Sequence, residues 1–105
     1  MSPSLHDYQR PILLAAVRGL VEAARLERGL WPARAPERRF YLGVDAAAQE
    51  VLHPELGSSR EPDWLDREQP AFREGYLEAS LLIATAATAD EPPLRLALPS
   101  PSPVG

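Results

Sequence analysis

The clearest hydrophobic pattern in the chain lies between residues 70 and 89. Apolar side chains recur there at positions i, i+4, i+7, i+11 and i+14, which are Phe72, Tyr76, Ala79, Ile83 and Ala86. This is the repeat of one face of an α-helix. Pro70 suits the first turn, because the N–H that it lacks would have no partner there. The pattern predicts a helix over residues 70–89, and Gly75 beside the apolar face permits another helix to approach closely.

A second helical pattern begins near the N-terminus. Apolar residues cover most of the circumference between residues 12 and 26, and the opposite polar strip is narrow. This strip consists of Arg18, Glu22 and Arg25. Asp7 is a favourable N-cap residue, and Gly29 followed by Pro32 is a typical stop. We therefore expect a helix from Asp7 or Arg10 to Arg28 that is covered by more than one neighbour.

The pattern is less regular in the middle and at the end of the chain. Residues 30–39 have the prolines and arginines of a loop, and residues 40–44 are rich in strand-forming side chains. Asp45 suits the cap of one short helix over residues 46–52. Residues 94–98 alternate leucine with Arg or Ala, as a half-buried strand does. Residues 40–44 and 94–98 are thus candidates for a minimal two-stranded β-ribbon.

Together these patterns predict a mainly α fold in one small domain. Two principal helices and one short helix occupy residues 1–98, and a Pro-rich disordered tail occupies residues 99–105. The chain has 105 residues, which is the size of a single domain, and its 45% hydrophobic content excludes wholesale disorder. Alternating prolines at 99, 101 and 103 prevent any regular element in the tail.

Composition narrows the possible chemistry. The sequence has no cysteine, which excludes disulfides, thiolate metal sites and cysteine nucleophiles. It also has no Gly-rich phosphate loop and no Gly-x-Ser-x-Gly motif. We therefore expect no enzymatic activity, no catalytic residues, no cofactor and no bound metal.

Two further features of the sequence concern its location and origin. No basic region precedes an apolar run at the N-terminus, and the first helix carries charges, so we expect a cytoplasmic protein that does not enter a membrane. All the basic residues are arginine, and with abundant Ala, Leu and Pro this is typical of a GC-rich bacterial or phage genome.

One alternative is a metal-binding or enzymatic helical bundle that uses Glu50 and His53. The spacing Glu-x-x-His places both side chains on one helical face, as in carboxylate-bridged di-iron bundles. Those bundles need a second such pair, which this sequence lacks, and Pro54 ends the helix at the histidine. A histidine at a helix C-terminus explains the pattern more simply.

A second alternative is a nucleic-acid-directed protein or a nucleic-acid mimic. Arg34, Arg38 and Arg39 precede two aromatic residues, as in patches that hold single strands. The acidic positions between residues 61 and 78 resemble a phosphate backbone, although Arg60, Arg67 and Arg73 neutralise half of this charge. A net charge of −4 is opposite to the usual basic footprint, so binding of nucleic acid is not the favoured interpretation.

The charge is unevenly distributed along the chain. Residues 1–40 have seven arginines and four acids, a net charge of +3, whereas residues 41–105 have four arginines and eleven acids, a net charge of −7. Such complementary parts commonly face each other. We expect arginines of the first part to lie near acids of the second. The arginines are Arg25, Arg28, Arg38 or Arg39, and the acids are residues such as Asp66, Glu68, Glu74 or Glu78.

The favoured hypothesis is a non-enzymatic protein–protein interaction or regulatory adaptor module. We expect it to form a homodimer and to bind another protein, because the first helix is apolar on more sides than one small domain covers. The expected dimer contact is either Val17 with Val21 or the stripe of Ala79, Ile83 and Ala86. The candidate partner-binding residues are Val17, Val21, Trp31, Arg38, Arg39, Trp64, Phe72, Tyr76 and Ile83.

Overall fold

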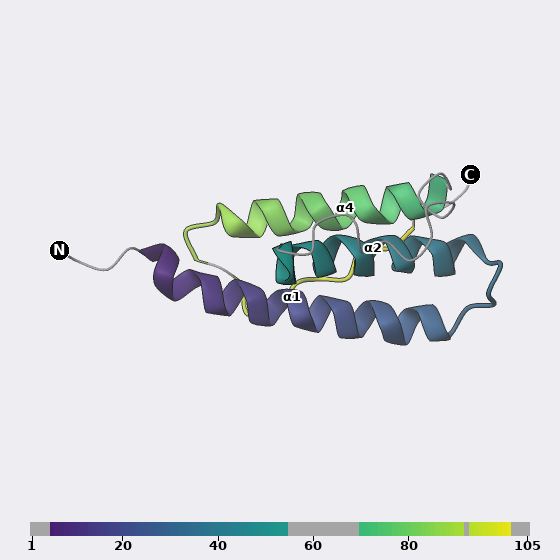
Figure 1. Ribbon diagram of the computed structural model, residues 1–105, viewed down its shortest axis with the longest axis horizontal. Coiled ribbons are helices and arrows are strands. Elements are labelled where there is room, and N and C mark those ends of the chain that lie inside the picture. The colour runs from purple at the N-terminus through teal and green to yellow at the C-terminus, as the bar shows by residue number, and fades with distance from the viewer. Residues whose placement is uncertain (1–4, 55–69, 92, 102–105) are drawn as a thin grey trace.

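The protein has three helices among the residues described by its computed structural model, which are residues 5–54, 70–91 and 93–101. They are α1 (Leu5–Gly29), α2 (Pro36–Leu52) and α4 (Pro70–Ala87). In Figure 1, α2 lies between the other two; α1 runs antiparallel to it, and α4 runs in the same direction as α2. Because α1 and α4 touch only sparsely, α2 provides the main contact for both. The mainly helical fold predicted from the sequence is confirmed.

Helix α1 is slightly longer than the sequence pattern predicts. It extends from Leu5 to Gly29, so Asp7 lies inside the helix rather than at its cap, and Pro11 also lies inside it. The residues that α1 buries recur every three to four positions and face α2. They are Ala16, Val17, Leu20, Val21 and Ala24. These five apolar side chains of α1 are therefore covered by other parts of the same chain.

Helix α2 corrects the largest error of the sequence-based expectations. Residues 40–44 are helical rather than a strand, the predicted loop shortens to residues 30–35, and the short helix becomes a full one beginning at Pro36. Pro36 stands at the start of the helix, where its fixed φ is favourable, and the N–H of Arg38 donates to the carbonyl of Ala35 at 3.1 Å. Burial explains the outcome, because Phe40 and Val44 are one helical turn apart and fully buried.

Helices α2 and α4 approach so closely that their backbones touch. A Cβ atom at Gly43 would lie 2.1 Å from the carbonyl oxygen of Phe72. A Cβ atom at Gly75 would lie 1.9 Å from the carbonyl oxygen of Phe40. Only glycine, which has no side chain, permits such an approach. The close packing expected beside Gly75 is thus confirmed, and its counterpart is Gly43, one turn before the buried Ala47.

Helix α4 spans Pro70–Ala87 and confirms the helix predicted for residues 70–89, except for two residues at its end. The side chains of Phe72, Ala79, Ile83 and Ala86 are buried, as their spacing predicts. Thr88 closes the helix, since its N–H donates to the carbonyl of Ala84 at 3.2 Å.

The segment after α4 returns along the helices without forming a strand. Residues 93–101 have no regular secondary structure, and in Figure 1 this yellow segment runs from the end of α4 back toward the start of α2. The β-ribbon is therefore wrong for the described residues, because its first strand is helical. The leucines of residues 94–98 do not share a face: Leu94 is 85% exposed, whereas Leu96 is 7% exposed and joins the core.

The start of the predicted tail lies in the described structure. Pro99 and Pro101 are half-buried, and Leu98 packs against the core. Residues 102–105 lie outside the described residues. The boundary predicted between residues 98 and 99 therefore falls inside a segment that packs on the helices.

Alkaline pH is expected to destabilise the protein through the buried side chain of Tyr41. Burial raises the pKa of the Tyr41 phenol above its usual value of 10.0, and the carboxylate of Glu27 raises it further; a hydrogen bond with Ser100 lowers it, and Glu37 adds a smaller rise. Because the folded pKa exceeds the unfolded one, this contribution to stability is complete below about pH 10 and is lost as the pH rises through the folded value.

The measurement is the free energy of unfolding in urea from about pH 8 to about pH 12. The native chain should lose stability more steeply than the Tyr41→Phe variant does. Equal slopes for the two proteins would show that the Tyr41 phenol has the same pKa in the folded and unfolded chain.

Candidate interaction surface

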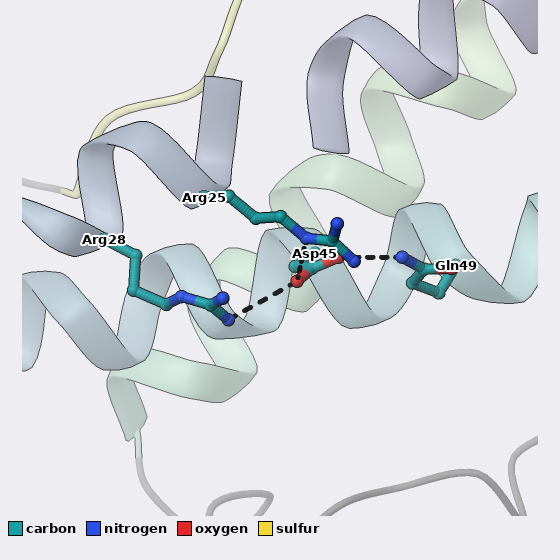
Figure 2. A network of polar contacts seen from close by, with 4 residues as sticks. All are labelled: Arg25, Arg28, Asp45 and Gln49. Carbon is teal, nitrogen blue, oxygen red and sulfur yellow. Dashed lines mark hydrogen bonds and ion pairs between the residues drawn. The ribbon is translucent and has the colours of Figure 1, made fainter. Parts of the chain in front are cut away.

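The carboxylate of Asp45 on α2 is the centre of a group of polar contacts between α2 and α1 (Figure 2). Its Oδ2 atom lies 3.4 Å from Nη1 of Arg28 and 3.6 Å from Nε of Arg25, both on α1. Its Oδ1 atom accepts a hydrogen bond from Nε2 of Gln49 at 3.3 Å. The Asp45 side chain is largely buried while Arg25 is exposed. This group fixes the register of α1 against α2. Both carboxylate oxygens of Asp45 have partners within the chain.

The Asp45 group bears on two sequence-based expectations. Asp45 was predicted to cap a short helix, but it lies in the middle of α2. Arg25 and Arg28 pair with Asp45, which is an acid of the second part of the chain but not one of the four examples named in the prediction; two of those, Asp66 and Glu68, lie outside the described residues. The basic first part of the chain does contact the acidic second part here, through a residue that the sequence had suggested for another role.

Four of the predicted partner-binding residues are core residues. Val17 is fully buried, and Val21, Phe72 and Ile83 are buried almost as completely. The same holds for Ala79 and Ala86 of the expected dimer stripe. All of these side chains contact the chain's own helices, because α2 covers the faces of α1 and α4 that the sequence suggested were left over.

The other predicted partner-binding residues lie nearer the surface. Trp31, between α1 and α2, is 37% exposed, and its carbonyl accepts a hydrogen bond from Nη1 of Arg38 at 3.3 Å. Arg38, Arg39 and Tyr76 are half-buried. Trp64 lies outside the described residues. Trp31 and Arg38 are therefore neighbours, whereas Tyr76 belongs to α4.

The aromatic residues of the suggested nucleic-acid patch are not available for stacking. Phe40 is fully buried, and Tyr41 is nearly so. Their rings pack edge to face, with centroids 5.3 Å apart. Bases of a single strand stack on exposed aromatic rings, so the arginines at 34, 38 and 39 remain without the aromatic platform that the sequence suggested.

Glu50 and His53, the pair suggested for metal binding, lie in different surroundings. The carboxylate of Glu50 on α2 accepts a hydrogen bond from the hydroxyl of Tyr76 on α4. His53 follows the end of α2 and is exposed. Within residues 5–54, 70–91 and 93–101, no group of three or more His, Asp or Glu side chains is arranged to hold a metal ion. Glu50 thus links α2 to α4.

An exposed apolar face on α4 was missed by the sequence reasoning. Leu77 is 58% exposed and Leu81 is 66% exposed, one helical turn apart, on the side of α4 away from the core. Exposed small residues continue the same side. We call this surface the outer stripe, and its residues are Leu77, Leu81, Ala84, Thr85 and Thr88. No charged residue occurs between positions 79 and 89, a signal that the sequence already carried.

A second exposed apolar surface lies at the end of α1. Leu26 and Leu30 are each 75% exposed, and Trp31 follows them. Charged residues of both signs surround this α1-end surface, since Arg25 and Arg34 are exposed nearby and Glu22 is exposed one helical turn before Leu26. The two surfaces therefore differ in character: the residues of the outer stripe are uncharged, whereas the α1-end surface has charged residues around it, with arginine in excess.

Comparisons of the chain with protein-family models, curated proteins and solved structures gave no match. None of the described helices combines the length and the apolar character needed to cross a membrane.

Proposed function

We propose that this protein is a non-enzymatic interaction module that works as a homodimer, with the outer stripe of α4 as the contact between the two copies. The observation that carries the proposal is the exposure of Leu77 and Leu81 on a helix whose opposite face already fills the core. Large apolar side chains side by side on a small protein commonly mark a protein contact. Burying them against an equivalent helix would remove this apolar area from water in both copies.

A second copy suits the outer stripe because of its charge. The chain carries a net charge of −4, so two copies repel each other overall. The five residues of the stripe are uncharged, and the exposed Glu78 lies at its edge, so two copies that meet there bring apolar surfaces together with this carboxylate at the rim. A self-complementary contact of this kind fits two-fold symmetry, which is the commonest symmetry of homodimers.

The adaptor role is assigned to the α1-end surface. Leu26, Leu30 and Trp31 present apolar contact area, and the exposed Arg25 and Arg34 flank it. Such a surface suits a protein partner that is apolar at its centre and acidic at its rim, because complementary charges steer association and select the partner. Dimerisation would present two of these surfaces at once. We place this activity in the cytoplasm of a bacterium or phage-infected cell.

Two variants test the proposal, and each replaces one exposed leucine by aspartate. Leu81→Asp places a carboxylate in the outer stripe, and Leu26→Asp places one on the α1-end surface, at a leucine that is exposed to a similar degree. Leu81→Asp should be monomeric because an unpaired charge would be buried in the dimer contact. Leu26→Asp should remain a dimer. Both should keep native helical circular dichroism, since both positions are exposed.

Light scattering of the two variants at equal concentration gives the answer. A dimeric Leu81→Asp chain would exclude the outer stripe as the contact. A monomeric Leu26→Asp chain would move the contact to the end of α1.

A further inference from the structure

Residues 93–101 lie on the helices in the way that a bound peptide lies on its receptor. We call this segment the strap. It runs from the end of α4 back toward the start of α2 (Figure 1). Leu96 is buried in the core and Leu98 packs against the core, whereas Ala97 between them is exposed. Side chains two positions apart therefore point to the same side, as they do in an extended chain.

The strap is attached to the helices through its side chains. Among the described residues, no main-chain hydrogen bond joins the strap to a helix. Besides the leucines, the hydroxyl of Ser100 is hydrogen-bonded to the hydroxyl of Tyr41 on α2, and Pro99 and Pro101 beside it are half-buried. A segment held in this way can leave the helices without breaking any of their backbone hydrogen bonds.

The surface beneath the strap is apolar, and we call it the strap site. Leu96 belongs to the same core cluster as buried side chains of all three helices. If the strap left, part of this cluster would be exposed to water, so the site favours being covered by another apolar segment. A segment that contains proline suits such a site, because its restricted backbone loses little conformational entropy on binding.

We propose that the strap site binds an extended segment of a partner protein, and that the strap occupies the site while the partner is absent. The partner segment has the chemistry of the strap, with two apolar side chains two positions apart, followed by proline and a small hydroxyl residue. The strap site is a third contact surface, separate from the outer stripe and from the α1-end surface. The proposal does not depend on the homodimer.

The charges near Tyr41 define one further requirement for the partner segment. The carboxylates of Glu27 and Glu37 act on the Tyr41 phenol, whose hydroxyl is hydrogen-bonded to Ser100. A neutral hydroxyl residue is compatible with these two carboxylates, whereas a carboxylate or a phosphorylated serine in its place would be repelled. The partner residue that takes the place of Ser100 is therefore uncharged.

The test is an NMR titration of the isotope-labelled full chain with a synthetic peptide of residues 93–101. In the chain with Leu96→Asp the strap is released. The peptide, added up to about 5 mM to match the effective concentration of a tethered segment, should shift the amide signals around Tyr41 until they saturate. The native chain should need at least about tenfold more peptide, because its own strap occupies the site most of the time.

Two altered peptides serve as controls. A peptide with Leu96→Asp should cause no shifts, and a peptide with Ser100→Asp should bind several-fold more weakly. If the chain with Leu96→Asp loses helical circular dichroism, the titration is made with Leu98→Asp, because Leu98 is only half-buried.

Three results would overturn the proposal. One is the absence of shifts in the chain whose strap is released. Another is equal binding of the peptide to the native and variant chains, since the strap would then not occupy the site. The third is a shift around Tyr41 that unlabelled native chain causes and the peptide does not, which would assign the site to a second copy.

Discussion

Replacing Gly75 with alanine is expected to separate α2 from α4 and to destabilise the protein by about 3 kcal/mol, toward the upper end for overpacking of a core. The added Cβ would lie 1.9 Å from the carbonyl oxygen of Phe40 and 2.8 Å from its carbonyl carbon. These are backbone atoms inside a helix, so no side-chain rotation relieves the clash. Gly43→Ala should have a similar effect, because its Cβ would lie 2.1 Å from the carbonyl oxygen of Phe72.

The matched control is Gly19→Ala in the exposed middle of α1. Nothing lies within 4 Å of a Cβ at Gly19. Alanine there should raise the free energy of unfolding by about 0.5–1 kcal/mol, since it favours the helix more than glycine does. Thermal and urea unfolding followed by circular dichroism compare the three variants. If Gly75→Ala were stabilising in the way that Gly19→Ala is, the close approach of α2 and α4 would be contradicted.

Leu96→Asp is expected to release the segment of residues 93–101 from the helices. Leu96 is 7% exposed within the core, and a carboxylate there would have to leave it for water. The cost should be about 2–3 kcal/mol, the value of burying one leucine, because the segment has no regular secondary structure and detaches without unfolding the helices. Helical circular dichroism should therefore be unchanged while the midpoint of urea unfolding falls.

Leu94→Asp is the control in the same segment. Leu94 is 85% exposed, so this change should stay within about 0.5 kcal/mol of the native chain. Equal losses for the two aspartate variants would mean that Leu96 does not dock as described. Loss of helical signal in Leu96→Asp would show that the segment holds the helices together.

The sequence predicts α1 and α4 well because both have long and regular helical periodicity. It fails for α2 because aromatic and β-branched residues near position 40 favour a strand locally, and Pro36 resembles part of a loop. The competing signal was present, since Phe40, Val44 and Ala48 are spaced by one helical turn each. Burial against α1 and α4 outweighs the local preference.

The interaction surface is harder to predict than the fold. Large apolar side chains are typical both of protein cores and of protein–protein contacts. Choosing contact residues by apolar character therefore selects Val17 and Ile83, which the helices bury in the core. Leu77 and Leu81 were missed because the opposite side of the same helix has the stronger stripe. Only the packing of α2 on α4 distinguishes the face that is used in the core from the face that is left exposed.

The most direct test of the account is the solution mass of the unmodified chain, measured by light scattering or sedimentation from about 1 to about 100 µM, a range that spans ordinary dimer affinities. The homodimer proposed through the outer stripe predicts that the mass rises to twice the 11.5 kDa of one chain. A mass that stays at 11.5 kDa over the whole range would contradict it.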